Sequence, residues 1–128
     1  MNLLLDTHAL IWFLEDDPQL GRKARSAIGD AENRSFVSDA SAWEVGIKHA
    51  MGRLTLPVLF EELFPGRVEA LGFRVLPIRH AHLYRLIKLP SHHRDPFDRL
   101  LIAQAMAEGM TLVSKDPHFA DYGVPLLW

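Results

Sequence analysis

The sequence contains no cysteine, so the chain has no disulfide bonds, no thiolate ligands for zinc and no cysteine nucleophile. It also lacks any uninterrupted run of about 18 apolar residues, the length that a membrane-spanning helix needs. The sequence has no large excess of either positive or negative charge, since it contains 14 Lys and Arg and 16 Asp and Glu, which gives a formal net charge of −2. This balance argues against nucleic-acid binding through bulk charge and leaves a local basic patch as the means of holding an anionic ligand.

Apolar residues, by contrast, are plentiful. The 128 residues are 48% hydrophobic and 23% charged, which excludes a disordered protein and suffices for the core of one domain. Residues 1–6 carry no basic segment, and their apolar run is too short for a secretory signal. We therefore expect one soluble, cytoplasmic domain over residues 1–128 that has no membrane as a partner.

Short apolar runs alternate with helical patterns along the whole chain. The runs that predict strands cover residues 3–5, 35–38, 73–78, 110–114 and 124–128. The helical patterns cover residues 7–14, 21–28, 41–51, 57–71, 80–89 and 96–108, and Pro65-Gly66 splits the fourth of these. Strands that alternate with helices predict a parallel α/β sheet with right-handed crossovers, and Pro125 places the last strand at an edge.

Carboxylates occur where such a sheet binds ligands. Asp6 and Asp116 directly follow the first and fourth predicted strands. Glu44 lies near the start of the helix after the second strand, and Asp98 lies in the first turn of helix 96–108. Because strand ends and the starts of the following helices share one edge of a parallel sheet, we expect these four side chains to project into one crevice.

Each acid taken alone has a simpler explanation as a helix cap. Asp6 precedes a helix, and Ser41 and Glu44 have the spacing of a capping box. Asp95 precedes a proline at the start of helix 96–108, and Asp116 precedes a proline at a turn. For a single acid of this kind, capping is the more frequent role, by about two to one.

Capping does not explain why four acids gather at one sheet edge. Two like charges about 4 Å apart repel by about 4 kcal/mol at an effective dielectric constant of about 20. Such carboxylates stay partly protonated unless a cation neutralises them. Oxygen ligands without cysteine or a well-spaced pair of histidines suit a hard ion, Mg²⁺ or Mn²⁺, which commonly also contacts substrate phosphates. The pattern therefore indicates phosphodiester chemistry at a metal site.

Four segments, in order along the chain, resemble the motifs of one family. The first is LLLDTHALIW at residues 3–12, and the second is SAWE at residues 41–44. The third, HRDPFDRLLIAQA at residues 93–105, is long enough to be specific, and the fourth is TLVSKDPHF at residues 111–119. Together they resemble the PIN-domain ribonucleases, in particular the VapC-type toxins of bacterial toxin–antitoxin pairs.

This resemblance implies a PIN-like three-layer α/β/α sandwich with a mainly parallel central sheet. It implies a metal-dependent endoribonuclease, with Mg²⁺ or Mn²⁺ as the cofactor, whose catalytic and metal-binding residues are Asp6, Glu44, Asp98 and Asp116. The implied partners are an RNA substrate, a cognate antitoxin protein and a second copy of the chain in a homodimer. The alternative is a catalytically silent PIN-like binding module that acts through protein or RNA contacts.

The third acidic motif offers two carboxylates, Asp95 and Asp98. We prefer Asp98, one turn into the helix, as the ligand and interpret Asp95 as the N-cap, so that Asp95 becomes an accessory residue. Thr7 and Ser114, which neighbour the first and fourth acids, are expected as accessory residues as well.

Local positive charge must hold the RNA backbone. Arg94 and Arg99 flank the third motif and Lys115 precedes the fourth acid, so these three are the candidate phosphate contacts. Solvated surface charge is an equally frequent role for such residues.

Two tryptophans and a pair of histidines have less definite roles. Trp12 and Trp43 either stack on unpaired bases or belong to a core or an interface, which is the more frequent role for tryptophan among apolar residues. The adjacent His92 and His93 lie in a polar loop, where they either contact RNA or, as is more frequent for such histidines, have no special function.

Overall fold

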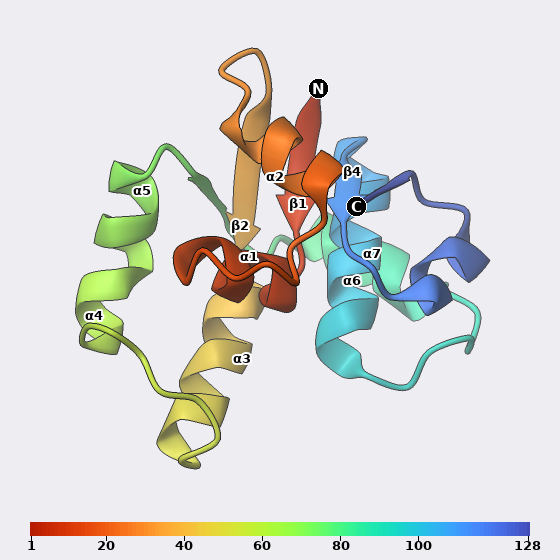
Figure 1. Ribbon diagram of the computed structural model, residues 1–128. Helices are drawn as coiled ribbons and strands as arrows, with labels where there is room; N and C mark the ends of the chain where they lie inside the picture. Colours follow the sequence, from red (N-terminus) through yellow and green to blue (C-terminus); the bar gives the residue numbers. More distant parts are fainter.

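The computed structural model describes residues 1–128 and contains one sheet of five parallel strands (Figure 1). The strands are β1 (Asn2–Leu5), β2 (Arg34–Ser38), β3 (Arg74–Leu76), β4 (Thr111–Val113) and β5 (Leu126–Leu127). Their order across the sheet is β3-β2-β1-β4-β5, and every neighbouring pair is parallel. The predicted parallel sheet is therefore confirmed, and β5 lies at an edge as its neighbour Pro125 predicts.

Helices connect the strands and cover the sheet. They are α1 (Thr7–Leu14), α2 (Arg22–Gly29), α3 (Asp39–Ala50), α4 (Phe60–Glu62), α5 (Val68–Ala70), α6 (His80–Ile87) and α7 (Pro96–Glu108). A π-helical turn, Leu63–Arg67, joins α4 to α5, and a 3-10 helix, Pro117–Tyr122, follows β4. None of these helices has both the length and the apolar character that crossing a bilayer requires.

The central strand supplies side chains to two separate apolar cores. Leu4 packs on one face of the sheet together with Leu101 of α7. Leu3 and Leu5 pack on the opposite face together with residues of α1 and α2, such as Leu10. All three leucines of β1 are 0% exposed, as expected for a parallel strand that is covered on both faces. The predicted three-layer α/β/α sandwich is thereby confirmed.

One helix start differs from its prediction. α3 begins at Asp39 because the Ser38 hydroxyl accepts a hydrogen bond from the backbone N–H of Ala40 and forms the N-cap. Ser41 is consequently an interior helical residue, so the capping box predicted for Ser41 and Glu44 was wrong. This leaves the Glu44 carboxylate available for other contacts.

The region 57–71 is less helical than its apolar pattern suggests. Helix begins only at Phe60, and Phe64 has a non-helical backbone conformation, with φ −118° and ψ 124°. The break comes directly before Pro65, where the sequence predicts a split.

Strands β1, β2 and β4 all end at the same edge of the sheet, the lower edge in Figure 1. Asp6 follows β1 there, Ser38 ends β2 and Ser114 follows β4. α1 and α3 start at this edge, so three segments that are distant in sequence place polar side chains at the same edge.

Candidate functional site

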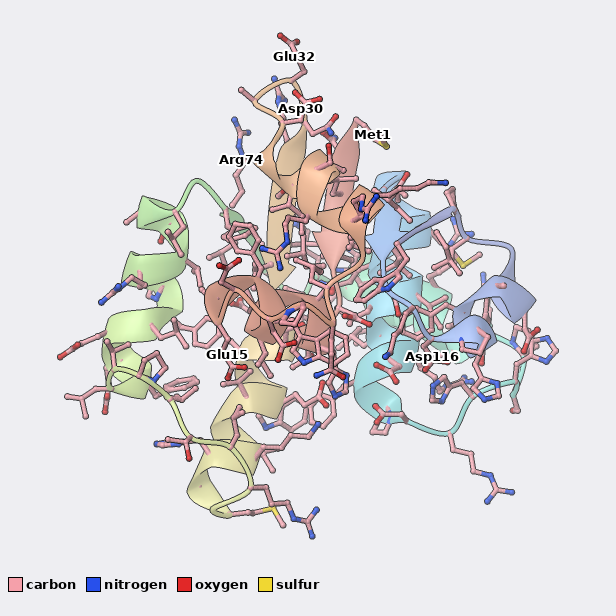
Figure 2. The ribbon with its side chains drawn as sticks, in the orientation of Figure 1. Met1, Glu15, Asp30, Glu32, Arg74 and Asp116 are labelled. Carbon is pink, nitrogen blue, oxygen red and sulfur yellow. The ribbon has the colours of Figure 1, made fainter.

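Three of the four predicted acids line one groove at this edge. Asp6 enters it from the turn between β1 and α1, Asp98 from the first turn of α7, and Asp116 from the start of the 3-10 helix after β4. The groove has a volume of about 460 Å³. Figure 2 shows Asp116 below β4 and beside the lower end of α7, the end at which that helix begins.

The local backbone fixes these carboxylates through one oxygen each. Asp6 Oδ1 accepts a hydrogen bond from the Ala9 N–H at 2.7 Å, and Asp116 Oδ1 accepts one from the His118 N–H at 2.9 Å. Asp95 Oδ1 accepts from the N–H groups at the start of α7. The predicted capping is confirmed for these three acids. It does not exclude a site, because each of these carboxylates has a second oxygen that takes no part in the cap.

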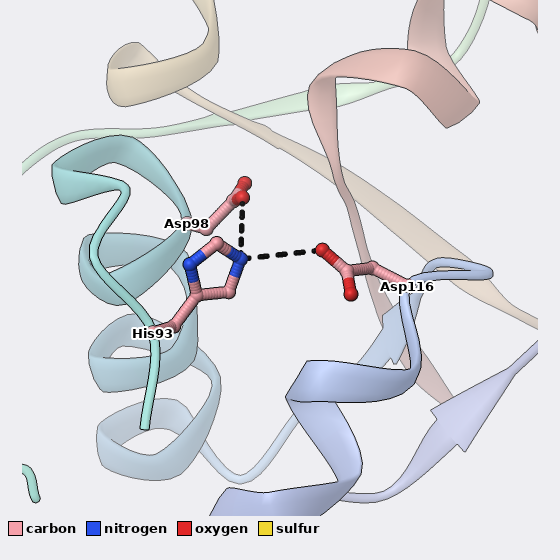
Figure 3. A group of neighbouring side chains, drawn as sticks. All are labelled: His93, Asp98 and Asp116. Atoms are coloured by element: carbon pink, nitrogen blue, oxygen red, sulfur yellow. Dashed lines mark hydrogen bonds and ion pairs between the residues drawn. The ribbon is translucent and has the colours of Figure 1, made fainter. Parts of the chain in front are cut away.

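A histidine joins two of the acids (Figure 3). His93 Nε2 lies 3.1 Å from Asp98 Oδ2 and 3.2 Å from Asp116 Oδ2. Its other ring nitrogen, Nδ1, accepts a hydrogen bond from the backbone N–H of Asp95 at 3.2 Å. Because Nδ1 accepts, the neutral ring carries its proton on Nε2 and donates it to the two carboxylates.

His93 is the residue of this site that sequence reasoning missed. Its ring, Asp98 and Asp116 offer ligand atoms that all lie within 4.8 Å of one another, the one such group in the protein. The structure thus places in the acidic group a histidine for which the sequence analysis expected no special function. The available signal was its place at the first position of the third motif, two residues before the N-cap Asp95, where a short loop folds back onto the helix.

Glu44 stands beside this group without lining the groove. Its Oε1 accepts a hydrogen bond from Thr7 Oγ1 at 2.6 Å, and its Oε2 forms an ion pair with Lys48 Nζ at 2.8 Å. Its charge nevertheless raises the pKa of both Asp6 and Asp98. Of the four acids that were expected to share one groove, three line it. The fourth, Glu44, lies beside the groove and is paired with Lys48.

Two of the three residues predicted as accessory, Thr7 and Ser114, are buried and contact the acids. Thr7 holds Glu44, as described above. A hydrogen bond from the Ser114 side chain lowers the pKa of Asp6, and Ser114 Oγ also accepts the backbone N–H of Asp116 at 3.1 Å. Both side chains therefore fix the positions of carboxylates at the site.

The acids destabilise one another's charged forms. Burial raises the pKa of Asp6, and the hydrogen bonds from Ser114 and Ala9 only partly oppose this. Burial, followed by the charges of Asp95, Glu44, Asp6 and Asp116, raises the pKa of Asp98 to about 7. Near neutral pH Asp98 is divided between its protonated and charged forms, and a cation bound beside it would favour the charged form.

The three basic candidates differ in their surroundings. Lys115 is exposed and lines the groove, and Arg94 is exposed in the loop before α7. Arg99 instead donates hydrogen bonds to the carbonyl oxygens of Pro90 and His93 and to the Tyr122 hydroxyl. These contacts engage its guanidinium in holding the loop over residues 90–95 against the rest of the protein.

The fold and the groove together define an α/β protein with a carboxylate site at the carboxyl edge of a parallel sheet. The family model of the PIN domain matches residues 3–125. This chain belongs to the PIN domain family.

Known proteins similar to this chain agree with that assignment. Ribonuclease VapC16 of Mycobacterium tuberculosis is 33% identical over 60 residues, which are 47% of this chain and 43% of that protein, so the match spans less than half of the relative's length. VapBC2 from Rickettsia felis, solved with a DNA fragment from its promoter, aligns over 99% of this chain and 98% of its own at a TM-score of 0.72 and 13% identity. FitAcB from Neisseria gonorrhoeae aligns over 98% of this chain and 96% of its own, at a TM-score of 0.71 and 20% identity. At such identities the solved structures show a shared fold.

Proposed function

We propose that this protein is a metal-dependent endoribonuclease of the VapC type, the toxin of a toxin–antitoxin pair, which hydrolyses RNA phosphodiester bonds. The observation that carries the proposal is the groove in which Asp6, Asp98 and Asp116 meet from three separate elements, with the pKa of Asp6 and Asp98 raised. Membership of the PIN domain family and the similarity to a protein named as a ribonuclease support this reaction type.

The donor set fits a hard divalent cation, Mg²⁺ or Mn²⁺. Carboxylate oxygens are the ligands that such ions prefer, and burial together with the neighbouring acids raises the pKa of Asp98, so that a bound cation would favour its charged form. Asp6, Asp98 and Asp116 would hold the ion, with Glu44 adding negative potential from beside the groove. When bound, a divalent cation of this kind lowers the pKa of a coordinated water and stabilises negative charge on a phosphate and its leaving oxygen.

The protein's own contribution is to fix the carboxylates before substrate arrives. Backbone N–H groups hold Asp6 and Asp116, and the Nε2–H of His93 keeps Asp98 and Asp116 together. Asp116 is better placed than Glu44 to accept a proton from the attacking water and orient it. Asp116 lines the groove, whereas Glu44 lies beside it and forms an ion pair with Lys48.

Two of the three basic candidates fit the RNA backbone. Lys115 lines the groove next to Asp116, and Arg94 is exposed one residue from His93. We assign phosphate contacts to these two side chains. We leave Arg99 out, because its donors are already bound to carbonyl oxygens and to a tyrosine hydroxyl.

The proposed toxin role implies protein partners. Among the structurally similar proteins is one described as a toxin–antitoxin complex from Klebsiella pneumoniae, with a TM-score of 0.64 at 18% identity. We propose a cognate antitoxin and a homodimer for this chain as well, and a cytoplasmic location where RNA is accessible. Exposed apolar side chains on α6, with Tyr84 at 63% and Ile87 at 80% exposure, provide surface suited to such contacts.

Replacement of Asp6 tests the proposal. Asp6→Asn retains the Oδ1 acceptor that caps α1 but removes a negative charge from the groove, so the fold should persist. We expect the rate of RNA cleavage to fall about 100-fold or more, and EDTA to abolish the activity that Mg²⁺ or Mn²⁺ restores. Asp121→Asn, an exposed acid that does not line the groove, is the matched control and should cleave at the parent rate.

Two results would refute the nuclease assignment. One is cleavage by Asp6→Asn at the parent rate, and the other is cleavage that persists in EDTA. RNA binding without any cleavage by the parent protein would support the silent binding module instead.

A further inference from the structure

The groove is also lined by two aromatic side chains that the proposed reaction does not use, Trp12 of α1 and Trp128, which follows β5. We call the part of the groove that these tryptophans line its aromatic half, and the part that Asp6, Asp98 and Asp116 line its acidic half. The two indole rings meet edge to face, with centroids 5.8 Å apart and planes at 69°. An acidic half and an aromatic half therefore share one hollow of about 460 Å³, a size typical of a small-ligand site.

The aromatic wall is supported from behind. A Cβ atom on Gly21 would lie 2.6 Å from Trp128 Cδ1, so this indole is seated against the bare backbone of a glycine. Trp12 packs against the core that contains Leu3 and Leu5, and yet the side chain is only half-buried. Rings held in this way lose little conformational freedom when a ligand stacks on them, which favours binding.

Positive charge lies over the same surface. Lys115 Nζ is 4.9 Å from the centroid of the Trp12 ring, and the next residue, Asp116, lines the acidic half. Lys115 is exposed, so its flexible chain can turn from the ring towards an incoming phosphate. An aromatic face beside a cation is the arrangement with which proteins hold a base and its phosphate in single-stranded nucleic acid.

We propose that the aromatic half binds one unpaired nucleotide of the RNA next to the phosphate that is cleaved. The base stacks on Trp12, and its phosphate faces Lys115. This inference rests on the proposed function, since it takes the acidic half as the place of cleavage. A base within a duplex is already stacked on both of its neighbours and cannot reach Trp12, so the base that Trp12 contacts is unpaired.

Binding of a short, fluorescently labelled single-stranded RNA tests the inference without turnover. The Asp6→Asn protein with Mg²⁺ present is titrated and followed by fluorescence anisotropy. Trp12→Ala in this background should weaken binding about tenfold or more, whereas Trp12→Phe, which keeps an aromatic face, should weaken it far less. Trp43→Ala is the matched control, because Trp43 is 59% exposed, packs on Phe97 and does not line the groove. It should bind as the parent does.

Two further measurements separate a binding role from a structural one. Lys115→Gln should weaken binding and reduce the slope of log K against log salt concentration by about 0.7, the contribution of one phosphate contact to a single strand. A duplex of the same sequence should bind more weakly than the single strand, and its affinity should be the same for Trp12→Ala as for the protein with Trp12. Unfolding curves for each variant verify that the fold is intact.

Parent-like binding by Trp12→Ala would overturn the inference. So would equal losses in Trp12→Ala and Trp12→Phe, or equal losses in Trp12→Ala and Trp43→Ala. Failure of this inference and failure of the nuclease assignment are distinguishable. If RNA binding depends on Trp12 but the protein never cleaves RNA, only the nuclease assignment is refuted. Metal-dependent cleavage that is independent of Trp12 refutes only the stacking site.

Discussion

Two histidines that contact α7, His82 and His93, make the same kind of backbone hydrogen bond but have different surroundings. In both His82 and His93, Nδ1 accepts a backbone N–H, from Arg79 and from Asp95 respectively, and Nε2 faces a carboxylate. His82 is 0% exposed and meets one acid, Glu108, at 2.8 Å. His93 is partly exposed and lies between two acids.

The surroundings explain the difference between these two histidines. Around His82 each donor has an acceptor, since Ser38 Oγ donates to Gln104 Oε1 at 2.5 Å and Gln104 Nε2 lies 3.3 Å from His82 Nδ1. This network ties β2, α6 and α7 together and gives each of its buried polar groups a partner. Around His93, by contrast, two carboxylates share one imidazole N–H, and the pKa of Asp98 is raised by burial and by its acidic neighbours. A satisfied network indicates a structural role, whereas an unbalanced one indicates a ligand.

The largest effect on stability should come from His82→Ala. Removal of a fully buried ring leaves a cavity and deprives the Arg79 N–H and Gln104 of their partner, which costs about 3 kcal/mol in the free energy of unfolding. Urea unfolding measures this loss. RNA cleavage per folded molecule should stay at the parent level, and a loss of activity without a loss of stability would contradict the structural role of this network.

A smaller effect on the free energy of unfolding should come from Asp98→Asn, which should stabilise the metal-free protein. The pKa of Asp98 is raised to about 7 in the folded state, so the folded protein binds this proton more tightly than the unfolded chain does. Its contribution to the free energy of unfolding is therefore full below the ordinary pKa of 3.8 and is lost as pH rises through about 7. Asparagine carries no charge and can still accept the hydrogen bond from His93.

Asp98→Asn should therefore match the parent at pH 4 and exceed its stability at pH 8, by on the order of 1 kcal/mol after allowance for solvent screening. Urea unfolding in EDTA across this pH range gives the comparison. Asp121→Asn should show no such pH-dependent difference. Saturating Mn²⁺ should make the parent more stable than Asp98→Asn at pH 8, because the parent binds the cation more tightly. Equal stability of Asp98→Asn and parent at both pH values would contradict the unbalanced charge.

An effect of similar size, but a loss of stability, should come from His93→Ala. The variant loses a hydrogen-bond donor to Asp98 and Asp116 but keeps the backbone contacts of residue 93, so the metal-free protein should lose about 1 kcal/mol. Saturating Mn²⁺ should narrow this difference, because a cation then takes over the neutralisation of the same two carboxylates. A difference that widens on addition of Mn²⁺ would instead make His93 a metal ligand and contradict its role as a donor.

Much of the local structure could be predicted from the sequence because it depends on neighbouring residues. Asp95 caps α7, whose predicted range of 96–108 matches the observed bounds, and Gly109 ends it in the left-handed conformation with φ 67°. The apolar run of β1 predicts a strand buried on both faces. Where a nearby residue offered a better cap, as Ser38 did for α3, the predicted start was two residues late.

The site could be predicted only in part, since its contacts join segments that are far apart in sequence. Strand ends share one edge in any parallel sheet, which is why Asp6, Asp98 and Asp116 could be expected together. That Glu44 binds Lys48, or that Arg99 holds a loop, depends on side-chain packing that no spacing encodes.

By itself the sequence determined the order of the elements, the parallel sheet and the edge on which the acids gather, because capping, apolar periodicity and chain connectivity act over a few residues at a time. The tertiary structure alone decided which carboxylates remain unbalanced and which acquire partners. It brought His93 between Asp98 and Asp116, and placed Trp12 and Trp128 beside them, through the packing of a loop and two helices on one sheet edge. Electrostatic energy depends on distances in space, and only the folded chain sets those distances.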